Sequence, residues 1–256
     1  MAARTTKTPD ERAIAWRRAE HARVCDVVEQ WEHGTVFRAT QHPDFWAYNG
    51  VRVEGPATSV GVDLLVHEAD VRLGDMRHRQ VEVEDEAAGA RLRPGFAALG
   101  WTAERLVWMR LDGPGPPGRD FEEVPLEATR ELRSEWSRSA PWGSSEEAVR
   151  QLAADEEDVA GLRGSRALIG RDEAGVPIAF AIFVAHDGTA EVDQAYVTPE
   201  HRGRGLGGAV VAAAVRAAAA DVTYIVADDD GESKRLYARL GFRPVWLQHT
   251  FTRRPG

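Results

Sequence analysis

The chain has 256 residues, of which 43% are hydrophobic and 29% charged, a composition typical of a globular protein with one or two domains. Its formal net charge of −9 argues against a nucleic-acid partner, because phosphate binding needs a basic surface. The most apolar run, residues 209–220, is interrupted by Arg216 and is shorter than the roughly 20 residues of a membrane span, so no membrane partner is expected.

The N-terminal segment is polar over residues 1–10 and is predicted to be flexible. It lacks the apolar core of a secretory signal, and the single cysteine, Cys25, cannot form an internal disulfide. We therefore expect a cytoplasmic protein. Residues 11–32 carry apolar side chains at helical spacing, which predicts a helix with Cys25 on its buried face.

The remainder of a first domain, 11–111, alternates between predicted strands and helices. The predicted strands are 35–38, 45–54, 80–83 and 103–111, and the predicted helices are 56–76 and 86–99. Residues 112–120, DGPGPPGRD, consist mainly of proline and glycine, which predicts a linker and places the domain boundary there.

The second domain, 121–256, shows the element order β-α-α-β-β-β-α-β-α-β. Its predicted strands are 121–126, 166–170, 177–185, 190–197, 222–227 and 244–251, and its predicted helices are 127–137, 144–161, 209–220 and 231–240. Meander strands followed by strand–helix crossovers predict an α/β fold in which a mixed sheet has helices on both faces.

A short internal repeat links the two domains. Residues 96–101 read FAALGW and residues 237–242 read YARLGF, at an offset of 141 (237−96). Each motif follows a predicted helix and precedes an apolar strand, so the sequence indicates an internal duplication.

A loop rich in glycine and arginine, VTPEHRGRGLGG at residues 197–208, precedes an alanine-rich helix. It does not end in Gly-Lys-Ser/Thr, so it is not a triphosphate loop. Gly203, Gly205 and Gly208 do match G-x-G-x-x-G, with Asp228 following at the end of a strand. However, the preceding AEVDQAYV alternates with charges, and only 28 residues (256−228) follow Asp228, which makes a dinucleotide-dependent oxidoreductase the weaker alternative.

The pyrophosphate of coenzyme A fits the loop better. Consecutive N–H groups at a helix N-terminus bind anions, and glycines allow close approach of the backbone. The candidate residues for this contact are Arg202, Gly203, Arg204, Gly205, Leu206, Gly207 and Gly208.

At these residues the sequence resembles the GNAT superfamily of N-acetyltransferases, whose acetyl-coenzyme A signature is Arg/Gln-x-x-Gly-x-Gly/Ala. Arg202, Gly205 and Gly207 occupy its fixed positions, and residues 121–256 follow the element order of the superfamily. The first domain resembles the superfamily only over residues 79–111 and has no such loop, which implies a tandem GNAT protein with a degenerate N-terminal half.

The resemblance implies roles for further residues. The backbone of Ala195, Tyr196 and Val197 would contact the pantetheine and the thioester, and Tyr237 would protonate the departing thiolate. Asp230 and Ser233 would complete the cofactor set, although the family often has asparagine at the position of Asp230. Phe96 occupies the position of Tyr237 in the first repeat and lacks a hydroxyl.

The candidate base is Glu191, which lies 11 residues before Arg202 (202−191), a spacing at which several family members carry a catalytic glutamate. Asp193 shares its strand face, and two nearby carboxylates raise one of the two pKa values, which suits a base. A bound water is the alternative base.

The expected function is transfer of an acetyl group from acetyl-CoA to a primary amine whose identity the sequence leaves open. A non-catalytic acyl-CoA sensor is an alternative of another class. No metal is expected, because the eight histidines show no ligand spacing. We expect a monomer, with a homodimer left open.

Overall fold

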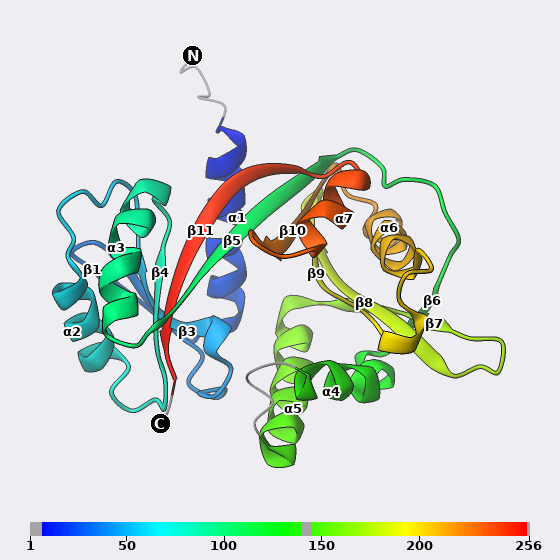
Figure 1. Cartoon of the computed structure of the whole chain (residues 1–256), viewed down its shortest axis with the longest axis horizontal. Coiled ribbons are helices and arrows are strands. Elements are labelled where there is room, and N and C mark those ends of the chain that lie inside the picture. The colour runs from blue at the N-terminus through cyan, green and yellow to red at the C-terminus, as the bar shows by residue number, and fades with distance from the viewer. Residues whose placement is uncertain (1–6, 140–144, 255–256) are drawn as a thin grey trace. The chain divides into compact units, whose positions relative to one another are not determined.

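The computed structural model describes residues 7–139 and 145–254, and the chain forms two compact units (Figure 1). The first unit comprises Met1–Trp108, Ala227–Asp230 and Pro244–Gly256, and the second comprises Met109–Val226 and Gly231–Arg243. The units are therefore not the two contiguous segments that the linker predicts. The reason is that the last strand, which follows the second repeat in sequence, belongs to the first unit.

The first unit is a sheet with helices on both faces. Its strands lie in the order β1-β2-β3-β4-β11-β5. The helices and strands are α1 (Pro9–Val24), β1 (Val27–Trp31), β2 (Gly34–Arg38), η1 (Trp46–Tyr48), β3 (Asn49–Val53), α2 (Val62–Arg72), β4 (Arg79–Val83), α3 (Glu86–Ala98), β5 (Thr102–Asp112) and β11 (Arg243–Arg253).

The two faces of this sheet have opposite character, because successive side chains of a strand point to opposite sides. Val51, Val53, Val81 and Val83 pack against α2 and α3 in a buried apolar cluster. Side chains of the other face contact α1 through charged groups, as in the hydrogen bond between Arg17 and Glu82 of 3.0 Å. The sheet of the first unit thus has an apolar core on one side and an ion-pair network on the other.

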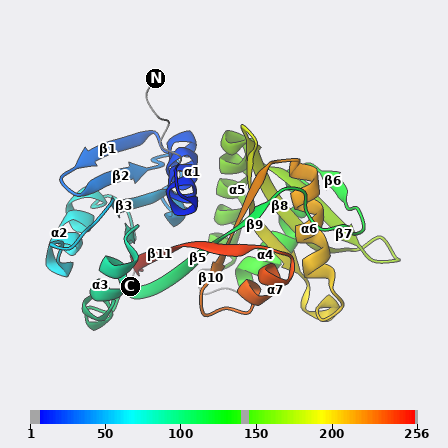
Figure 2. The ribbon, with the colours of Figure 1, turned by 90° about the horizontal axis from the view of Figure 1, so that it is seen from above.

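The second unit has strands in the order β10-β9-β8-β7-β6. Its elements are β6 (Glu122–Val124), η2 (Leu126–Thr129), α4 (Arg130–Arg138), α5 (Glu146–Arg163), β7 (Arg166–Arg171), β8 (Pro177–His186), β9 (Thr189–Val197), η3 (Pro199–His201), α6 (Leu206–Ala218), β10 (Val222–Asp228) and α7 (Ser233–Arg239). Helix α6 covers one face of this sheet and α4 and α5 cover the other (Figures 1 and 2). The predicted α/β class and the predicted element order of 121–256 are confirmed.

The two units repeat one topology. In each, three antiparallel strands are followed by a helix, a parallel strand and a second helix: β1-β2-β3-α2-β4-α3 and β7-β8-β9-α6-β10-α7. The repeat therefore begins at β1, earlier than the residues 79–111 to which the sequence resemblance is confined. The C-terminal strand β11 pairs with β4 of the first unit, from Arg253–Arg79 to His249–Val83.

The FAALGW and YARLGF motifs end α3 and α7 with the same cap. The N–H of Trp101 donates to the carbonyl of Phe96 at 3.0 Å, and the N–H of Phe242 donates to the carbonyl of Tyr237 at 3.1 Å. Gly100 and Gly241 adopt positive φ values of 76° and 97°, which glycine tolerates in this C-terminal motif. The aromatic pair of each motif packs at an interplanar angle of 57°. Shared geometry at this level supports duplication over coincidence.

One predicted helix is partly wrong. Helix α1 ends at Val24, and Val27–Trp31 form strand β1 paired with β2. Cys25, Val28 and Trp31 have helical spacing, but two features favour a strand here. Val27 and Val28 are β-branched, and the turn before Gly34 lets the chain reverse and pair with β2. Cys25 is buried as predicted, and burial raises the pKa of its thiol to about 12. No helix in the described part of the chain is long and apolar enough to cross a membrane.

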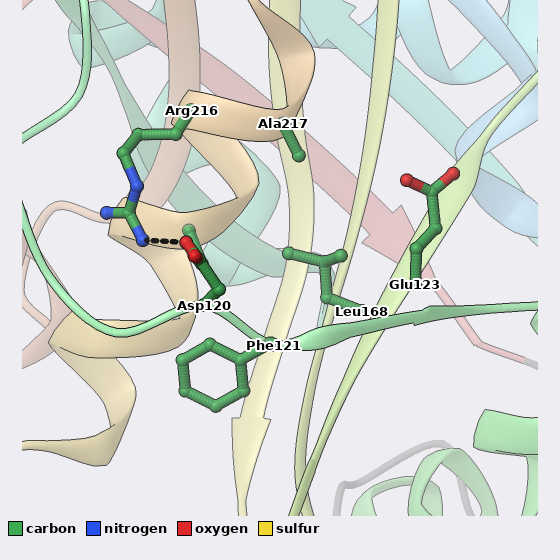
Figure 3. A pocket seen from close by; sticks show the side chains of 7 residues that line it. Asp120, Phe121, Glu123, Leu168, Arg216 and Ala217 are labelled. Atoms are coloured by element: carbon green, nitrogen blue, oxygen red, sulfur yellow. Dashed lines mark hydrogen bonds and ion pairs between the residues drawn. The ribbon is translucent and has the colours of Figure 1, made fainter.

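The proline- and glycine-rich linker lies along α6, held by Arg216, the one charged residue of that helix. The Arg216 guanidinium donates to the carbonyl oxygens of Pro116 at 2.8 Å and Arg119 at 2.7 Å, and it pairs with Asp120 at 3.2 Å. Figure 3 shows this contact in a surface hollow that Phe121 and Leu168 also line. The charged side chains that line this hollow are held in ion pairs, Asp120 with Arg216 and Glu123 with Arg166.

We expect Arg216→Gln to release the linker, because bonds from a charged donor to several backbone carbonyls would be lost. The free energy of unfolding should fall by about 1–2 kcal/mol, and limited proteolysis should become faster between residues 113 and 120. Arg150→Gln, which removes an exposed pair with Glu147, is the matched control. Equal cleavage rates in the two variants would contradict the prediction.

Candidate active site

The loop between β9 and α6 owes its shape to two glycines. Gly203 and Gly205 adopt φ values of 76° and 78°, a region that residues with a Cβ rarely occupy. Gly205 is also the N-cap of α6, so the helix begins without a side-chain cap. The loop therefore presents bare backbone at the start of a 13-residue helix.

The first turn of α6 is open to a ligand. The N–H groups of Leu206, Gly207 and Gly208 have no acceptor among the residues that the structure describes. A Cβ at Gly207 would lie 3.5 Å from Leu236, which is ordinary contact, so the protein's own packing does not require glycine there. Absence of a side chain at Gly207 instead leaves room for close approach of an anion to the helix N-terminus.

The two arginines of the loop, Arg202 and Arg204, differ in whether they bond to the rest of the protein. Arg202 donates from Nε to the carbonyl of Val197 at 3.0 Å and stacks over the ring of Tyr196. Arg204 is exposed, and its guanidinium bonds to none of the described residues. Arg202 thus shapes the loop with part of its guanidinium, while Arg204 is available to a ligand.

Strand β9 parts from β10 halfway along its length. The two strands pair in parallel from Val222–Thr189 to Ile225–Val192, and β9 then continues to Val197. The N–H of Thr198 donates to Ile178 of β8 at 3.0 Å. Because donors alternate along a strand, the N–H of Tyr196 faces β8, whereas those of Ala195 and Val197 face the opening. Two of the three predicted backbone contacts are therefore directed into the opening.

The predicted base and its neighbour are engaged with an arginine. Glu191 is 5% exposed and accepts from Arg163 at 3.1 Å, and Asp193 accepts from the same guanidinium at 2.6 Å. The predicted sharing of a strand face is confirmed, since both carboxylates meet Arg163. The sequence did not predict Arg163, which pairs with both carboxylates.

Tyr237 lies on α7 beside the loop. Its neighbour Leu236 is the side chain nearest to Gly207 and Gly208, which places α7 against the first turn of α6. Tyr237 is 9% exposed, and burial raises the pKa of its phenol. The hydroxyl is therefore protonated throughout the neutral range, as a proton donor must be.

The other two predicted cofactor residues stand apart from these contacts. Asp230 belongs to the segment that clusters with the first unit, where its carboxylate lies 3.7 Å from Arg105. Ser233 is the first residue of α7 and is half-buried. Their cofactor roles stay predictions.

A contact that the sequence did not reveal joins β9 to α4. Tyr196 is 7% exposed, and its hydroxyl donates to Glu135 at 2.8 Å. Burial, followed by the neighbouring carboxylate of Glu135, raises the pKa of Tyr196 to about 12. The two residues are 61 positions apart in sequence, so only folding brings them together.

The corresponding place in the first unit is closed. Strands β3 and β4 pair up to Val53–Val83, and the N–H of Glu84 then donates to Val53 at 3.2 Å, so the strands do not part. The guanidinium of Arg91 donates to the carbonyls of Ala57 and Val60 at 2.8 and 2.9 Å, in the loop before α2. A cation therefore bonds to the loop that matches, in the first unit, the loop between β9 and α6 of the second unit.

Comparison with known proteins agrees with this geometry. The sequence model of the acetyltransferase (GNAT) family matches residues 128–242. A search of curated proteins finds no match. Residues 128–242 thus form a GNAT domain.

Solved structures share the fold over most of this chain. A conserved protein of unknown function from Staphylococcus epidermidis has a TM-score of 0.74 at 13% identity, covering 91% of this chain and 95% of its own. A GCN5-related N-acetyltransferase from Kribbella flavida has a TM-score of 0.61 at 18% identity, covering 98% and 97%. A tandem GNAT protein from the clavulanic acid biosynthesis pathway has a TM-score of 0.52 at 17% identity, covering 81% and 77%. The tandem GNAT-like arrangement expected from the repeat is consistent with these likenesses.

We expect Glu135→Gln to lower the pKa of Tyr196 from about 12 toward the ordinary value of about 10, because the phenolate would no longer be repelled by a carboxylate. Phenolate absorbance would be titrated in each background, with the matching Tyr196→Phe variant subtracted to isolate this phenol. An unmoved midpoint would show that burial alone sets the value.

Proposed function

We propose that the protein is an N-acetyltransferase that transfers the acetyl group of acetyl-CoA to a primary amine within the second unit. The observation that carries the proposal is the pairing of two open backbone surfaces in one GNAT domain. These surfaces are the uncapped N-terminus of α6 and the edge of β9 beyond Val192.

The residues present fit the phosphates of coenzyme A. The N–H groups of Leu206, Gly207 and Gly208 and the dipole of α6 favour an anion at this point. Arg204 adds an exposed cation that bonds to none of the described residues. The protein's own packing does not require glycine at 207, because a Cβ there would make an ordinary contact of 3.5 Å with Leu236. The missing side chain lets an anion approach the backbone closely.

Acetyl-CoA supplies the acetyl group as a thioester. The N–H groups of Ala195 and Val197, which face away from β8, are the donors that would polarise its carbonyl oxygen. Fixed backbone donors of this kind stabilise developing oxyanions by roughly 3 kcal/mol, because they need no reorganisation during the reaction.

An alkyl amine has a pKa of about 10.4 and must lose a proton before it attacks. Glu191 is the candidate carboxylate, but Arg163 holds it in an ion pair, so its acceptance of that proton would require the pair to loosen. A water that relays the proton to solvent is the other base. The engagement of Glu191 also keeps a non-catalytic acyl-CoA-binding module as the second candidate function.

Tyr237 is the proposed general acid. Its neutral phenol lies on the helix that packs against Gly207 and Gly208, and it is the hydroxyl-bearing member of the Phe96–Tyr237 repeat pair. The matching Phe96 is fully buried and has no proton to donate. Together with the closed β3–β4 edge, this supports one active site per chain.

We expect calorimetric titration with acetyl-CoA to give one site per chain, and Gly207→Ala to weaken that binding at least tenfold while stabilising helix α6 by about 0.5–1 kcal/mol. Gly161→Ala is the matched control, because Gly161 lies within α5 with no atom near its would-be Cβ. The control should gain stability and keep full affinity. Two sites per chain would refute a silent first unit, and no binding to the wild-type protein would refute the transferase.

We expect Tyr237→Phe to lower kcat by about 100-fold or more, since general acid catalysis contributes about 10²–10⁴-fold. The affinity for acetyl-CoA should stay within about twofold, because the ring and its packing remain. The assay detects released thiol against a panel of primary amines. An unchanged kcat in single-turnover experiments would exclude the acid role, and acetyl-CoA binding without turnover of any amine would favour the sensor.

A further inference from the structure

Strand β9 contains a bulge at the point where it leaves β10. Phe183 of β8 pairs with Val192 and Ile182 pairs with Gln194, so Asp193 has no partner on β8. The last pair between β9 and β10 is Val192–Ile225, immediately before the bulge. Because a bulge bends its strand and increases the local twist, the direction of Ala195–Val197 depends on it.

A single guanidinium bridges this bulge. Arg163 lies in the last turn of α5, and its side chain is 4% exposed. It donates from one nitrogen to Glu191, before the bulge, at 3.1 Å and from another to Asp193, the bulged residue, at 2.6 Å. The planar fork of arginine can join two carboxylates in a fixed geometry, whereas the single ammonium of lysine cannot reproduce both bonds.

Helix α5 holds the other side of the bulge as well. Gln194 donates to Glu156 at 3.1 Å, and Glu156, which is 7% exposed, accepts from Arg133 of α4 at 2.5 Å. The consecutive residues Asp193 and Gln194 therefore both face α5. A regular strand would turn them to opposite sides, so these bonds match the bulged conformation and no other.

We propose that Arg163 is a positioning residue that fixes the bulge of β9 and thereby keeps the N–H groups of Ala195 and Val197 directed at the thioester. We call the bridge from Arg163 to Glu191 and Asp193 the clamp. The identity of the ligand rests on the proposed function, whereas the clamp rests on geometry alone. A buried ion pair stabilises a fold little more than apolar side chains of the same volume would. We therefore assign the effect of Arg163 to the conformation of the bulge that it bridges, and not to overall stability.

The test compares Arg163→Lys with Arg130→Lys, which alters an ion pair with Glu157 between α4 and α5 away from the bulge. Hydrogen exchange measured by mass spectrometry should show the amides among residues 193–197 that bond to β8 exchanging about tenfold faster in Arg163→Lys, while amides of β7 keep their rates. Its dissociation constant for acetyl-CoA should rise about tenfold. The control should match the wild type in both.

Asp193→Asn tests the same bridge in case the arginine variant misfolds. The Asp193 side chain is 36% exposed, and loss of its charge leaves the Arg163–Glu191 pair in place. It should produce a smaller effect of the same kind, and adding it to Arg163→Lys should change little further, because both substitutions break the same bridge.

Unchanged exchange at 193–197, or a uniform increase across β7, β8 and β9 in proportion to lost stability, would overturn the clamp. A selective increase at 193–197 in a protein whose wild type does not bind acetyl-CoA would retain the clamp and refute the proposed function. A selective increase with unchanged affinity would show that the clamp does not position the binding edge, and would overturn the proposal.

Discussion

The parting of β9 from β10 after Val192 is the feature on which the rest of the site depends. A parallel strand normally uses its backbone groups on both edges, and the interior of a sheet leaves none for a ligand. Here β9 stays bonded to β8 along one edge, and its other edge is not paired with β10 over its last five residues. The bulge at Asp193 makes this possible, because it redirects the strand without breaking its pairing with β8.

The same topology gives opposite results in the two units. In the first unit β3 stays paired with β4 to its end, and Arg91 fills the adjoining loop with a cation. In the second unit the strands separate, and glycines leave the start of α6 bare. The difference comes from a few side chains rather than from a change of fold, which agrees with duplication followed by loss of one site.

The arginines of the second unit differ in whether the fold gives them a bonding partner. Arg163 and Arg133 are buried and bonded to carboxylates, and Arg216 is bonded to the linker. Arg204 is exposed and has no partner among the described residues. A cation next to uncapped N–H groups is stabilised when an anion binds there, so a bound anion would give Arg204 the partner that it lacks in the folded protein.

The sequence by itself determined the α/β class, the element order of 121–256 and the loop before α6, because these depend on local spacing, turn residues and glycine. It also predicted that Glu191 and Asp193 share a face, which follows from strand periodicity. Only the tertiary structure decided that Arg163 lies between them, that Tyr196 meets Glu135, and that β11 completes the first unit. Each of these joins segments far apart in the chain, and no local pattern records which distant side chains or strands will meet on folding. The end of α1 at Val24 has the same origin, because pairing with β2 outweighed a helical spacing that was satisfactory in isolation.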